Sequence, residues 1–377
     1  MARYKFDQIA FNSTDKKKPV DEDKKHYIGL EHLDSGSLKV TRWGSEIAPK
    51  GEKLLMRKGD VLFGKRRAYQ KKVAIAPFDG IFSAHGMVLR PKTEVIDPDF
   101  FPLFIASDYF LDAAIKISVG SLSPTINWRD LKELEFDIPS LPVQKKLAKI
   151  LWAINDTKGA YEQLIQETDE LVKSQFIEMF GDPISNDRDW EYKTFPEVTE
   201  IVLGSTPSTK KPEYWDGNLK WITPAELTDT SFYVYDTEKH ITERGAEEAG
   251  LRLCPAETVL FSTRAPIGKT AIAGVDMYCN QGFKNFVCGP SIRPVYLYYL
   301  LTLKKNYFEG LGVGTTFKEL SRGRLEKVSI SVPPVDLQQG FENIYRQSDK
   351  SKFELQYVKR NVKEMITCSQ KKIQLNR

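Results

Sequence analysis

The spacing of apolar residues changes character twice along the 377-residue chain. Residues 1–141 and 183–334 contain short alternating apolar runs separated by Gly and Pro, for example at 73–76 and 270–273. This pattern is typical of strands and hairpins. Each region also holds one apolar segment of helical length, at 100–117 and 295–308. The spacing therefore predicts two α+β globules, each a mixture of helices and strands.

After each globule, apolar residues recur at intervals of four and three, over 142–182 and 335–377. This spacing predicts two long helices that pair along a narrow stripe as an antiparallel coiled coil, whereas a helix lying on its own domain favours a wider apolar face. A helix of this length, on the order of 55 Å, would act as a spacer. The helix-seam positions are Leu147, Ile150, Ile154, Tyr161, Leu164, Leu171, Phe341, Ile344, Leu355, Val358, Val362 and Met365.

The two halves of the chain also repeat one another. A shift of 194 residues aligns 26–33 with 220–227, 119–121 with 313–315, and 131–139 with 325–333; a shift of 198 aligns 60–66 with 258–264. Four matches in the same order at nearly one offset indicate a tandem repeat. The predicted domains are a first globule at 1–141, a first spacer helix at 142–182, a second globule at 183–334 and a second spacer helix at 335–377.

Composition restricts the class of protein. With 41% hydrophobic and 28% charged residues, the chain has the balance of a folded globular protein. No stretch approaches the roughly 18 apolar residues of a membrane span, and the N-terminus turns polar too early for a signal peptide, so we expect a cytoplasmic protein with no membrane contact. The spacings of its cysteines match neither a disulfide framework nor a zinc site, so no bound metal is predicted.

The net charge of +4 conceals a strongly basic window at 50–72, where nine Lys or Arg stand against two acidic residues. The centre of the window lies between apolar runs at 61–63 and 73–75, which predicts an exposed basic loop; a solvated hairpin is the alternative. Lys and Arg neutralise phosphates, Arg binds guanine edges and Gln binds adenine. The predicted DNA contacts in this loop are Lys65, Arg66, Arg67, Tyr69, Gln70, Lys71 and Lys72.

The matching place in the second copy, 261–269, keeps only Arg264 and Lys269 of these basic residues. Shared scaffold residues around a different loop are expected if each copy reads a different sequence. Lys210, Lys211 and Lys284 complete the predicted DNA contacts, with Asn280, Gln281 and Asn285 as further polar candidates.

A search for catalytic motifs finds none that is complete. The Gly-Lys-Thr at 268–270 lacks the glycine that a phosphate-binding loop needs five residues earlier. The chain has no dinucleotide fingerprint and no nucleophile elbow, and the acidic-x-Lys arrangement of Asp189, Glu191 and Lys193 is common by chance. A DNA methyltransferase or nuclease active on its own, and a protein scaffold that never binds DNA, are the alternatives to a DNA-binding subunit.

Several segments carry a resemblance to a known family. They are YIGLEHL at 27–33, KGDVLFGKRR at 58–67, SPTINWRDL at 123–131, IPSLPVQ at 138–144 and EMFGDP at 178–183. Together with the order globule, long helix, globule, long helix, they make the chain similar to the specificity (S) subunit of type I restriction-modification systems. The resemblance covers essentially the full chain.

The resemblance implies two target-recognition domains, each reading one half of a bipartite site in double-stranded DNA, with the paired helices setting the gap. It implies no catalysis and no cofactor in this chain. Two methylation (M) subunits that use S-adenosylmethionine would dock on it, and restriction (R) subunits that need ATP and Mg²⁺ would join them. One departure is that 316–320 (TFKEL) differs from the matching 122–126 (LSPTI), so we expect this closing segment to be built differently in the two copies.

Overall fold

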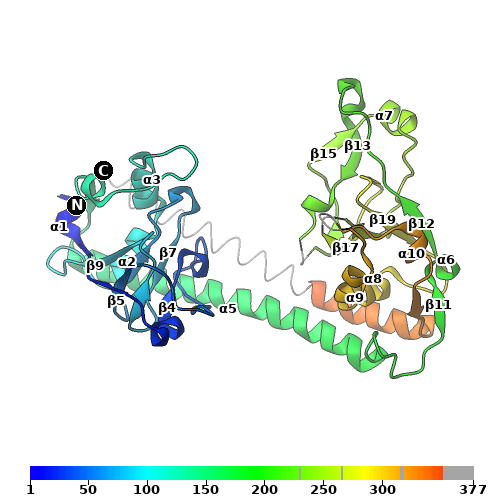
Figure 1. Ribbon diagram of the computed structural model, residues 1–377, viewed down its shortest axis with the longest axis horizontal. Helices are drawn as coiled ribbons and strands as arrows, with labels where there is room; N and C mark the ends of the chain where they lie inside the picture. The colour runs from blue at the N-terminus through cyan, green and yellow to red at the C-terminus, as the bar shows by residue number, and fades with distance from the viewer. Residues whose placement is uncertain (229–230, 265, 315–317, 351–377) are drawn as a thin grey trace. The chain divides into compact units, whose positions relative to one another are not determined.

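Helices and strands are mixed through both halves of the chain, which confirms the predicted α and β composition (Figure 1). The computed structural model describes residues 1–228, 231–264, 266–314 and 318–350. These fall into two units, Met1–Tyr161 and 162–350. Each unit has its own hydrophobic core, as expected for two domains.

An antiparallel ribbon of β1 and β10 joins the two ends of the first globule. Its main sheet is antiparallel with the order β2-β9-β6-β7, and a second sheet has the order β3-β5-β8-β4, in which β4 and β8 are parallel. The strands are β1 (Ala2–Lys5), β2 (Ala10–Ser13), β3 (Lys16–Lys17), β4 (Tyr27–Ile28), β5 (Lys53–Met56), β6 (Val61–Phe63), β7 (Val73–Ile75), β8 (Gly80–Phe82), β9 (Met87–Pro91) and β10 (Glu135–Ile138).

Helices α2 and α3 cover one face of the main sheet and bury a cluster of aromatic rings that includes Phe6, Phe110 and Phe136. The helix predicted over 100–117 is divided in two because Ser107 caps the second part, its Oγ accepting from the Phe110 N–H at 3.3 Å. The helices are α1 (Phe6–Ile9), α2 (Phe100–Ile105), α3 (Asp108–Lys116) and α4 (Trp128–Leu131), with 3₁₀ turns η1 (Asp21–His26), η2 (Leu30–His32) and η3 (Ala68–Gln70).

The second unit repeats this plan. The ribbon is now β11 with β20, and the main sheet has the order β12-β19-β16-β17-β14, where β14 is an added strand parallel to β17. The second sheet has the order β15-β13-β18, and β13 and β18 are parallel. The strands are β11 (Tyr192–Thr194), β12 (Thr199–Leu203), β13 (Trp215–Ile222), β14 (Tyr233–Val234), β15 (Lys239–Ile241), β16 (Val259–Thr263), β17 (Ile267–Ala273), β18 (Tyr278–Cys279), β19 (Lys284–Cys288) and β20 (Ser329–Ser331).

Apart from α7, the helices of the second unit stand at matching points in the chain order, which confirms the tandem repeat. Gly-Lys-Thr at 268–270 lies within strand β17, so it does not precede a helix as a phosphate-binding loop does. The helices are α6 (Phe195–Val198), α7 (Glu243–Glu248), α8 (Pro294–Leu303), α9 (Lys305–Leu311) and α10 (Arg322–Leu325), with 3₁₀ turns η4 (Pro212–Tyr214) and η5 (Pro224–Glu226).

Helix α5 (Leu141–Phe180) is one continuous helix of 40 residues, as the four-three spacing predicts. Its C-terminal end packs against a second helix that begins at residue 335: the rings of Phe176 and Phe341 lie 5.3 Å apart. A Cβ added at Gly340 would lie 3.8 Å from Met179, so the C-terminal end of α5 lies beside the start of the second helix. Figure 1 shows the described part of the second helix running antiparallel to this end of α5. Seam residues Leu355, Val358, Val362 and Met365 lie outside the described residues.

The seam positions are not the only apolar contacts of α5. Ala148 and Leu151 are buried against the first core, and Val172 and Phe176 against the second. Among the predicted seam residues, Phe341 is buried, Leu147, Ile154, Tyr161 and Ile344 are half-buried, and Ile150, Leu164 and Leu171 are exposed. The N-terminal end of α5 therefore packs on the first core and its C-terminal end on the second, through residues that are not among the predicted seam positions.

Candidate nucleic-acid interface

The basic loop of the first copy is fixed by backbone pairing on both sides. Arg66 forms an isolated β-bridge with Thr125, and Thr125 forms another with Val119. The N–H of Ile126 also donates to the carbonyl of Lys65 at 2.9 Å. The loop thus connects the antiparallel strands β6 and β7, and the closing segment holds one side of it.

The second copy has the same arrangement. Arg264 bridges Glu319, Glu319 bridges Val313, and the N–H of Leu320 donates to the Thr263 carbonyl at 2.9 Å. The offsets match the repeat, so Arg66 and Arg264 occupy equivalent positions. The expectation that the closing segments differ is wrong for the described part, 318–320; residues 316 and 317 lie outside it.

Two of the predicted DNA-binding lysines support the scaffold. The ammonium group of Lys72 donates to the Leu30 carbonyl at 2.6 Å, in the turn η2. Lys269 donates to the Pro224 carbonyl at 3.0 Å and to the Leu227 carbonyl, in the equivalent turn η5. Each lysine therefore holds a 3₁₀ turn against the main sheet of its unit. The lysine and the turn are more than 40 residues apart in the chain.

Other predicted contacts form ion pairs within the fold. The Lys71 ammonium lies 2.6 Å from the carboxylate of Asp108 and 2.7 Å from that of Asp112, on α3. Lys211 lies 3.1 Å from Glu248. These charges are already balanced by neighbouring carboxylates, which reduces what they add to the attraction for phosphate.

Lys284 is buried, and its side chain is only 9% exposed. Its ammonium donates to Thr263 Oγ1 at 2.9 Å and to Glu319 at 3.3 Å. Burial is the main cause that lowers the pKa of Lys284.

The remaining predicted residues are accessible to solvent. Arg66, Arg67 and Tyr69 are exposed at one edge of the first unit, and Lys210 is exposed in the second. Lys65 and Gln70 are half-buried, as is Arg264, whose guanidinium lies 3.9 Å from Glu319. Of the predicted contacts in the basic loop, the exposed Arg66, Arg67 and Tyr69 can therefore contact a phosphate most directly.

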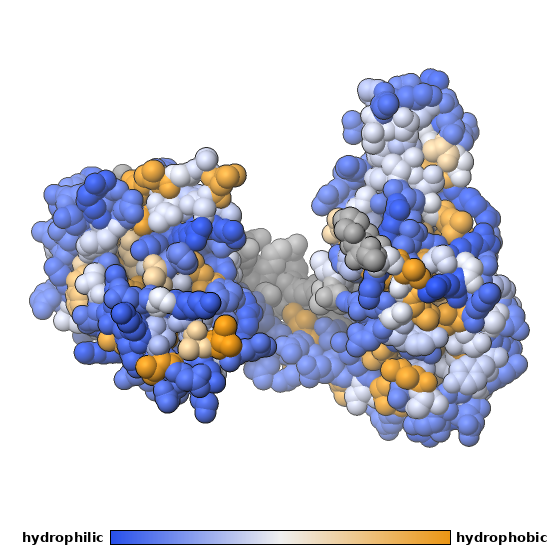
Figure 2. Space-filling model, in the orientation of Figure 1, coloured by the Kyte–Doolittle hydropathy of each residue, from blue (hydrophilic) through white to orange (hydrophobic). Residues whose placement is uncertain are grey.

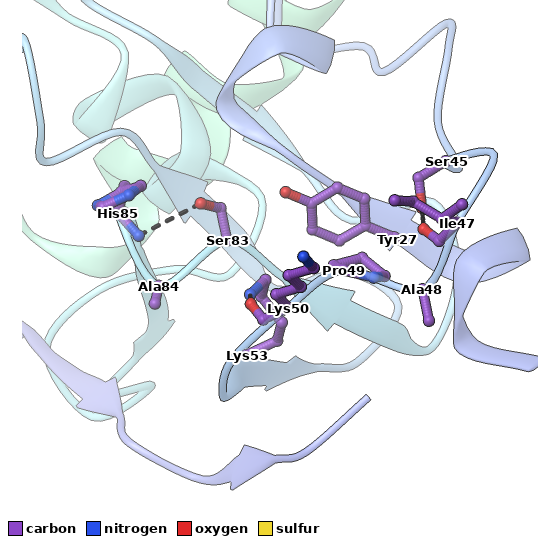
Figure 3. Close-up of a pocket in the computed structure, with 10 residues that line it drawn as sticks. All are labelled: Tyr27, Ser45, Ile47, Ala48, Pro49, Lys50, Lys53, Ser83, Ala84 and His85. Atoms are coloured by element: carbon purple, nitrogen blue, oxygen red, sulfur yellow. Dashed lines mark hydrogen bonds between the residues drawn. The ribbon is translucent and has the colours of Figure 1, made fainter. Parts of the chain in front are cut away.

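A cleft of about 390 Å³ opens in the first unit (Figure 3). Arg66 does not line it, but its Nη1 lies 3.4 Å from Nε2 of His85, which does. The Tyr27 ring lies between the 45–49 segment and Ser83, with its hydroxyl directed toward Ser83. Lys50, Lys53 and His85 line the same cleft. An aromatic ring among cations is the combination that binds nucleic-acid backbones and stacked bases.

Positive charges reinforce one another around this cleft. The pKa of His85 is lowered, chiefly by burial and then by the charges of Arg66, Lys65 and Lys53. The pKa of Lys65 is lowered by burial and by Lys16. These shifts indicate a cluster of positive charges that repel one another, and a bound polyanion would reduce that repulsion.

A second cleft, of about 460 Å³, surrounds the equivalent arginine in the second unit. Arg264, Asn280, Gly282 and Glu319 line it, together with the turn at 223–225 that Lys269 holds. This cleft carries a carboxylate that the first cleft lacks, and its charge is therefore mixed.

On the face shown in Figure 2, hydrophilic side chains dominate both units, and hydrophobic ones form small separate patches. Within the described residues, no group of three or more His, Cys, Asp or Glu is placed to hold a metal ion, and no helix is long and apolar enough to cross a membrane. At the suspected nuclease motif, Lys193 pairs with Glu191 at 3.1 Å.

Comparison with known families identifies the chain. The family described as type I restriction modification DNA specificity domain matches residues 8–168 and 187–363, once for each copy of the repeat. The chain belongs to this family. Because both copies match separately, the repeat seen in sequence and topology is a repeat of the specificity domain itself.

Relatives and solved structures agree with this assignment. The chain is 40% identical over 155 residues to the MjaIX specificity subunit of Methanocaldococcus jannaschii, covering 40% of this chain and 36% of that protein. It is 25% identical to the putative MjaX specificity subunit of the same organism, over 91% of this chain and 84% of that one. Thus the chain spans about a third of the first relative and most of the second.

Two solved structures share the fold over 97% of this chain. One comes from a study of complex assembly and conformational transition of a type I R-M system, with 95% of that chain covered, 19% identity and a TM-score of 0.57. The other is the type I restriction-modification S subunit from M. genitalium, with 94% covered, 13% identity and a TM-score of 0.57. At these identities the likeness establishes the fold alone.

Sequence reasoning missed several residues of the clefts. His85 and Ser83 follow β8, and Glu319 lies in the closing segment; none belongs to a basic run or a recognised motif. The repeat offset was the available signal, because it aligns Thr125 with Glu319 and so places Glu319 beside Arg264.

Proposed function

We propose that this chain is the sequence-specific DNA-binding subunit of a type I restriction-modification complex and has no catalytic activity of its own. Each of the two domains, within 1–141 and 183–334, reads one half of a bipartite site in double-stranded DNA. The long helices set the gap between the halves. The observation that carries the proposal is the double match to the DNA specificity domain, one match for each structurally equivalent copy.

The relatives are named specificity subunits of type I restriction enzymes, and a structural neighbour comes from a study of type I R-M complex assembly. This supports the proposal that the chain works with partner subunits. We assign methylation to two M subunits that bind S-adenosylmethionine, and cleavage to R subunits that bind ATP and Mg²⁺. This chain binds no cofactor.

The decisive experiment measures binding to duplex DNA by the purified chain, alone and with a methylation subunit, across a range of salt concentrations. Specific binding should weaken steeply with salt, because phosphate contacts release counterions. A chain that binds the methylation subunit but no duplex under any condition would be a protein scaffold instead. Cleavage or methyl transfer by the chain alone, with Mg²⁺ and S-adenosylmethionine, would make it an enzyme and refute the proposal.

A sharper form of the test uses the exposed arginines of the basic loop in the first unit. Replacing Arg66 and Arg67 by Ala should weaken or relax recognition at one half-site only. The matched change in the second copy, Arg264→Ala, should affect the other half. Equal losses at both halves in either variant would contradict the assignment of one domain to one half-site.

A further inference from the structure

The equivalence of the two clefts can be traced residue by residue. In the first unit Ile28 pairs with Phe82, and in the second Ile222 pairs with Cys279, both in parallel register. The positions that follow are therefore equivalent: Ser83 corresponds to Asn280, and His85 to Gly282. The bridges to the arginines make Thr125 equivalent to Glu319.

The turn after each strand is closed in the same way by different side chains. Ser83 Oγ accepts from the His85 N–H at 3.3 Å, and Asn280 Oδ1 accepts from the Gly282 N–H at 2.8 Å. In the asparagine the bond uses the carbonyl oxygen, so the NH₂ group is left for a ligand. A side chain at Gly282 has no room, since its Cβ would lie 2.9 Å from both Asn280 Oδ1 and Pro224.

The same backbone thus presents different chemistry in each copy. The first cleft offers the imidazole of His85 and the hydroxyl of Ser83. Arg66 lies next to it: its Nη1 is 3.4 Å from His85 Nε2, and its Nε donates to Ser123 Oγ at 3.1 Å. The second offers Arg264 with a carboxamide and a carboxylate, and Glu319 is 46% exposed.

An exposed carboxylate on a surface that binds DNA repels phosphates and lowers general affinity. A carboxylate at this place can instead contribute by a direct bond to a base, because Glu accepts from the amino group of cytosine. The neighbouring Asn and Arg could likewise bind adenine and guanine. In the second cleft, Arg264 and Lys284 flank Glu319 at 3.9 and 3.3 Å and hold its carboxylate in place.

We infer that the two clefts, together with the arginine bridge in or next to each, are the base-reading sites of the two domains, and that the side chains differing at equivalent positions make the half-sites different. These specificity-determining residues are Ser83, His85 and Thr125 in the first copy and Asn280 and Glu319 in the second. Lys72 and Lys269 are positioning residues that hold the 3₁₀ turn of each cleft. This inference rests on the proposed function and names the residues that carry it out.

Two substitutions test the inference by giving the second cleft the side chains of the first. Asn280→Ser keeps a turn-closing oxygen, as Ser83 demonstrates, but removes the NH₂ group. Glu319→Thr removes the carboxylate. The full chain and each variant, with a methylation subunit present, are used to select duplexes from a pool randomised over both halves. Each variant should lower the preference for one or two base pairs of a single half-site about ten- to a hundredfold.

A control and a second variant separate the outcomes. Glu247→Thr changes an exposed carboxylate on α7 outside the cleft lining and should leave the selected sequence unchanged. If loss of Glu319 destabilises buried Lys284, Asn280→Ser still carries the test. Unchanged preference in Asn280→Ser and Glu319→Thr, or an equal change in Glu247→Thr, overturns the inference. A wild-type chain that selects no sequence at all overturns the proposed function instead.

Discussion

Replacing Gln144 by Leu should loosen the attachment of α5 to the first globule. Gln144 is fully buried in the first turn of the helix. Its Oε1 accepts from the Asp97 N–H at 2.7 Å, and its Nε2 donates to the carbonyls of Val95 and Pro139 at 2.9 and 2.8 Å. One side chain thus joins the helix to the loop that precedes α2 and to the end of β10.

Leucine has a similar volume but leaves the buried Asp97 N–H, the buried Pro139 carbonyl and the partly buried Val95 carbonyl without these partners. Each lost hydrogen bond costs about 1 kcal/mol, and each buried group left unpaired costs about 1–3 kcal/mol. We therefore expect a loss of about 3 kcal/mol in the local free energy of unfolding. That corresponds to roughly a hundredfold faster hydrogen exchange where the opening is local.

The assay is hydrogen–deuterium exchange read by mass spectrometry on the peptide that contains the Asp97 amide. The matched control is Gln166→Leu on the same helix, because Gln166 is exposed and donates to Glu170 of the same helix at 3.1 Å. The control should change exchange by less than about threefold, since surface substitutions stay within about 0.5 kcal/mol. Equal exchange in Gln144→Leu and wild type would refute the reasoning.

Three further outcomes are expected. Arg90→Ala should destabilise the first unit by about 3–5 kcal/mol in denaturant unfolding, because Asp60 is buried and both its oxygens lie 2.7–2.8 Å from the guanidinium; a loss below about 1 kcal/mol would contradict this. DNA binding should tighten as pH falls below about 6.5, because nearby phosphates favour the protonated form of His85, whose pKa is lowered in the free chain. The stability of the free chain should fall over the same pH range, because His85 takes up a proton more readily in the unfolded chain. His85→Gln should flatten both the binding and the stability profile. Lys72→Met or Lys269→Met should weaken binding without changing its salt dependence, whereas a decrease of about one in the slope would make either residue a phosphate contact.

The repeat, the mixed fold and the long helix follow from the sequence because each depends on periodic spacing or on comparison of one half with the other. The equivalence of Arg66 and Arg264 also follows, from the 198-residue offset. The break between α2 and α3 was missed because a single serine cap interrupts an otherwise continuous apolar segment.

The roles of the lysines could not be read from the chain. A window of charge +7 suggests a loop turned toward solvent, but Lys71 pairs with α3 and Lys72 with a turn 42 residues earlier. Such long-range partners leave no local signal. The same limit applies to α5, where Ala148 and Val172 bury the helix against its globules although neither belongs to the four-three seam.

Comparison of the two copies distinguishes residues that maintain the fold from residues that differ for recognition, because the same backbone arrangement carries two different sets of side chains. Gln338 repeats the contacts of Gln144: its Oε1 accepts from the Arg293 N–H at 2.8 Å, and its Nε2 donates to the carbonyls of Ser291 and Pro333. A residue kept with its contacts in both copies serves what the copies share, namely the fold and the exit of the long helix. A position where backbone contacts agree but side chains differ, such as Thr125 and Glu319, serves what distinguishes them. In the proposed function, where each copy reads its own half-site, that difference is the sequence of DNA bound.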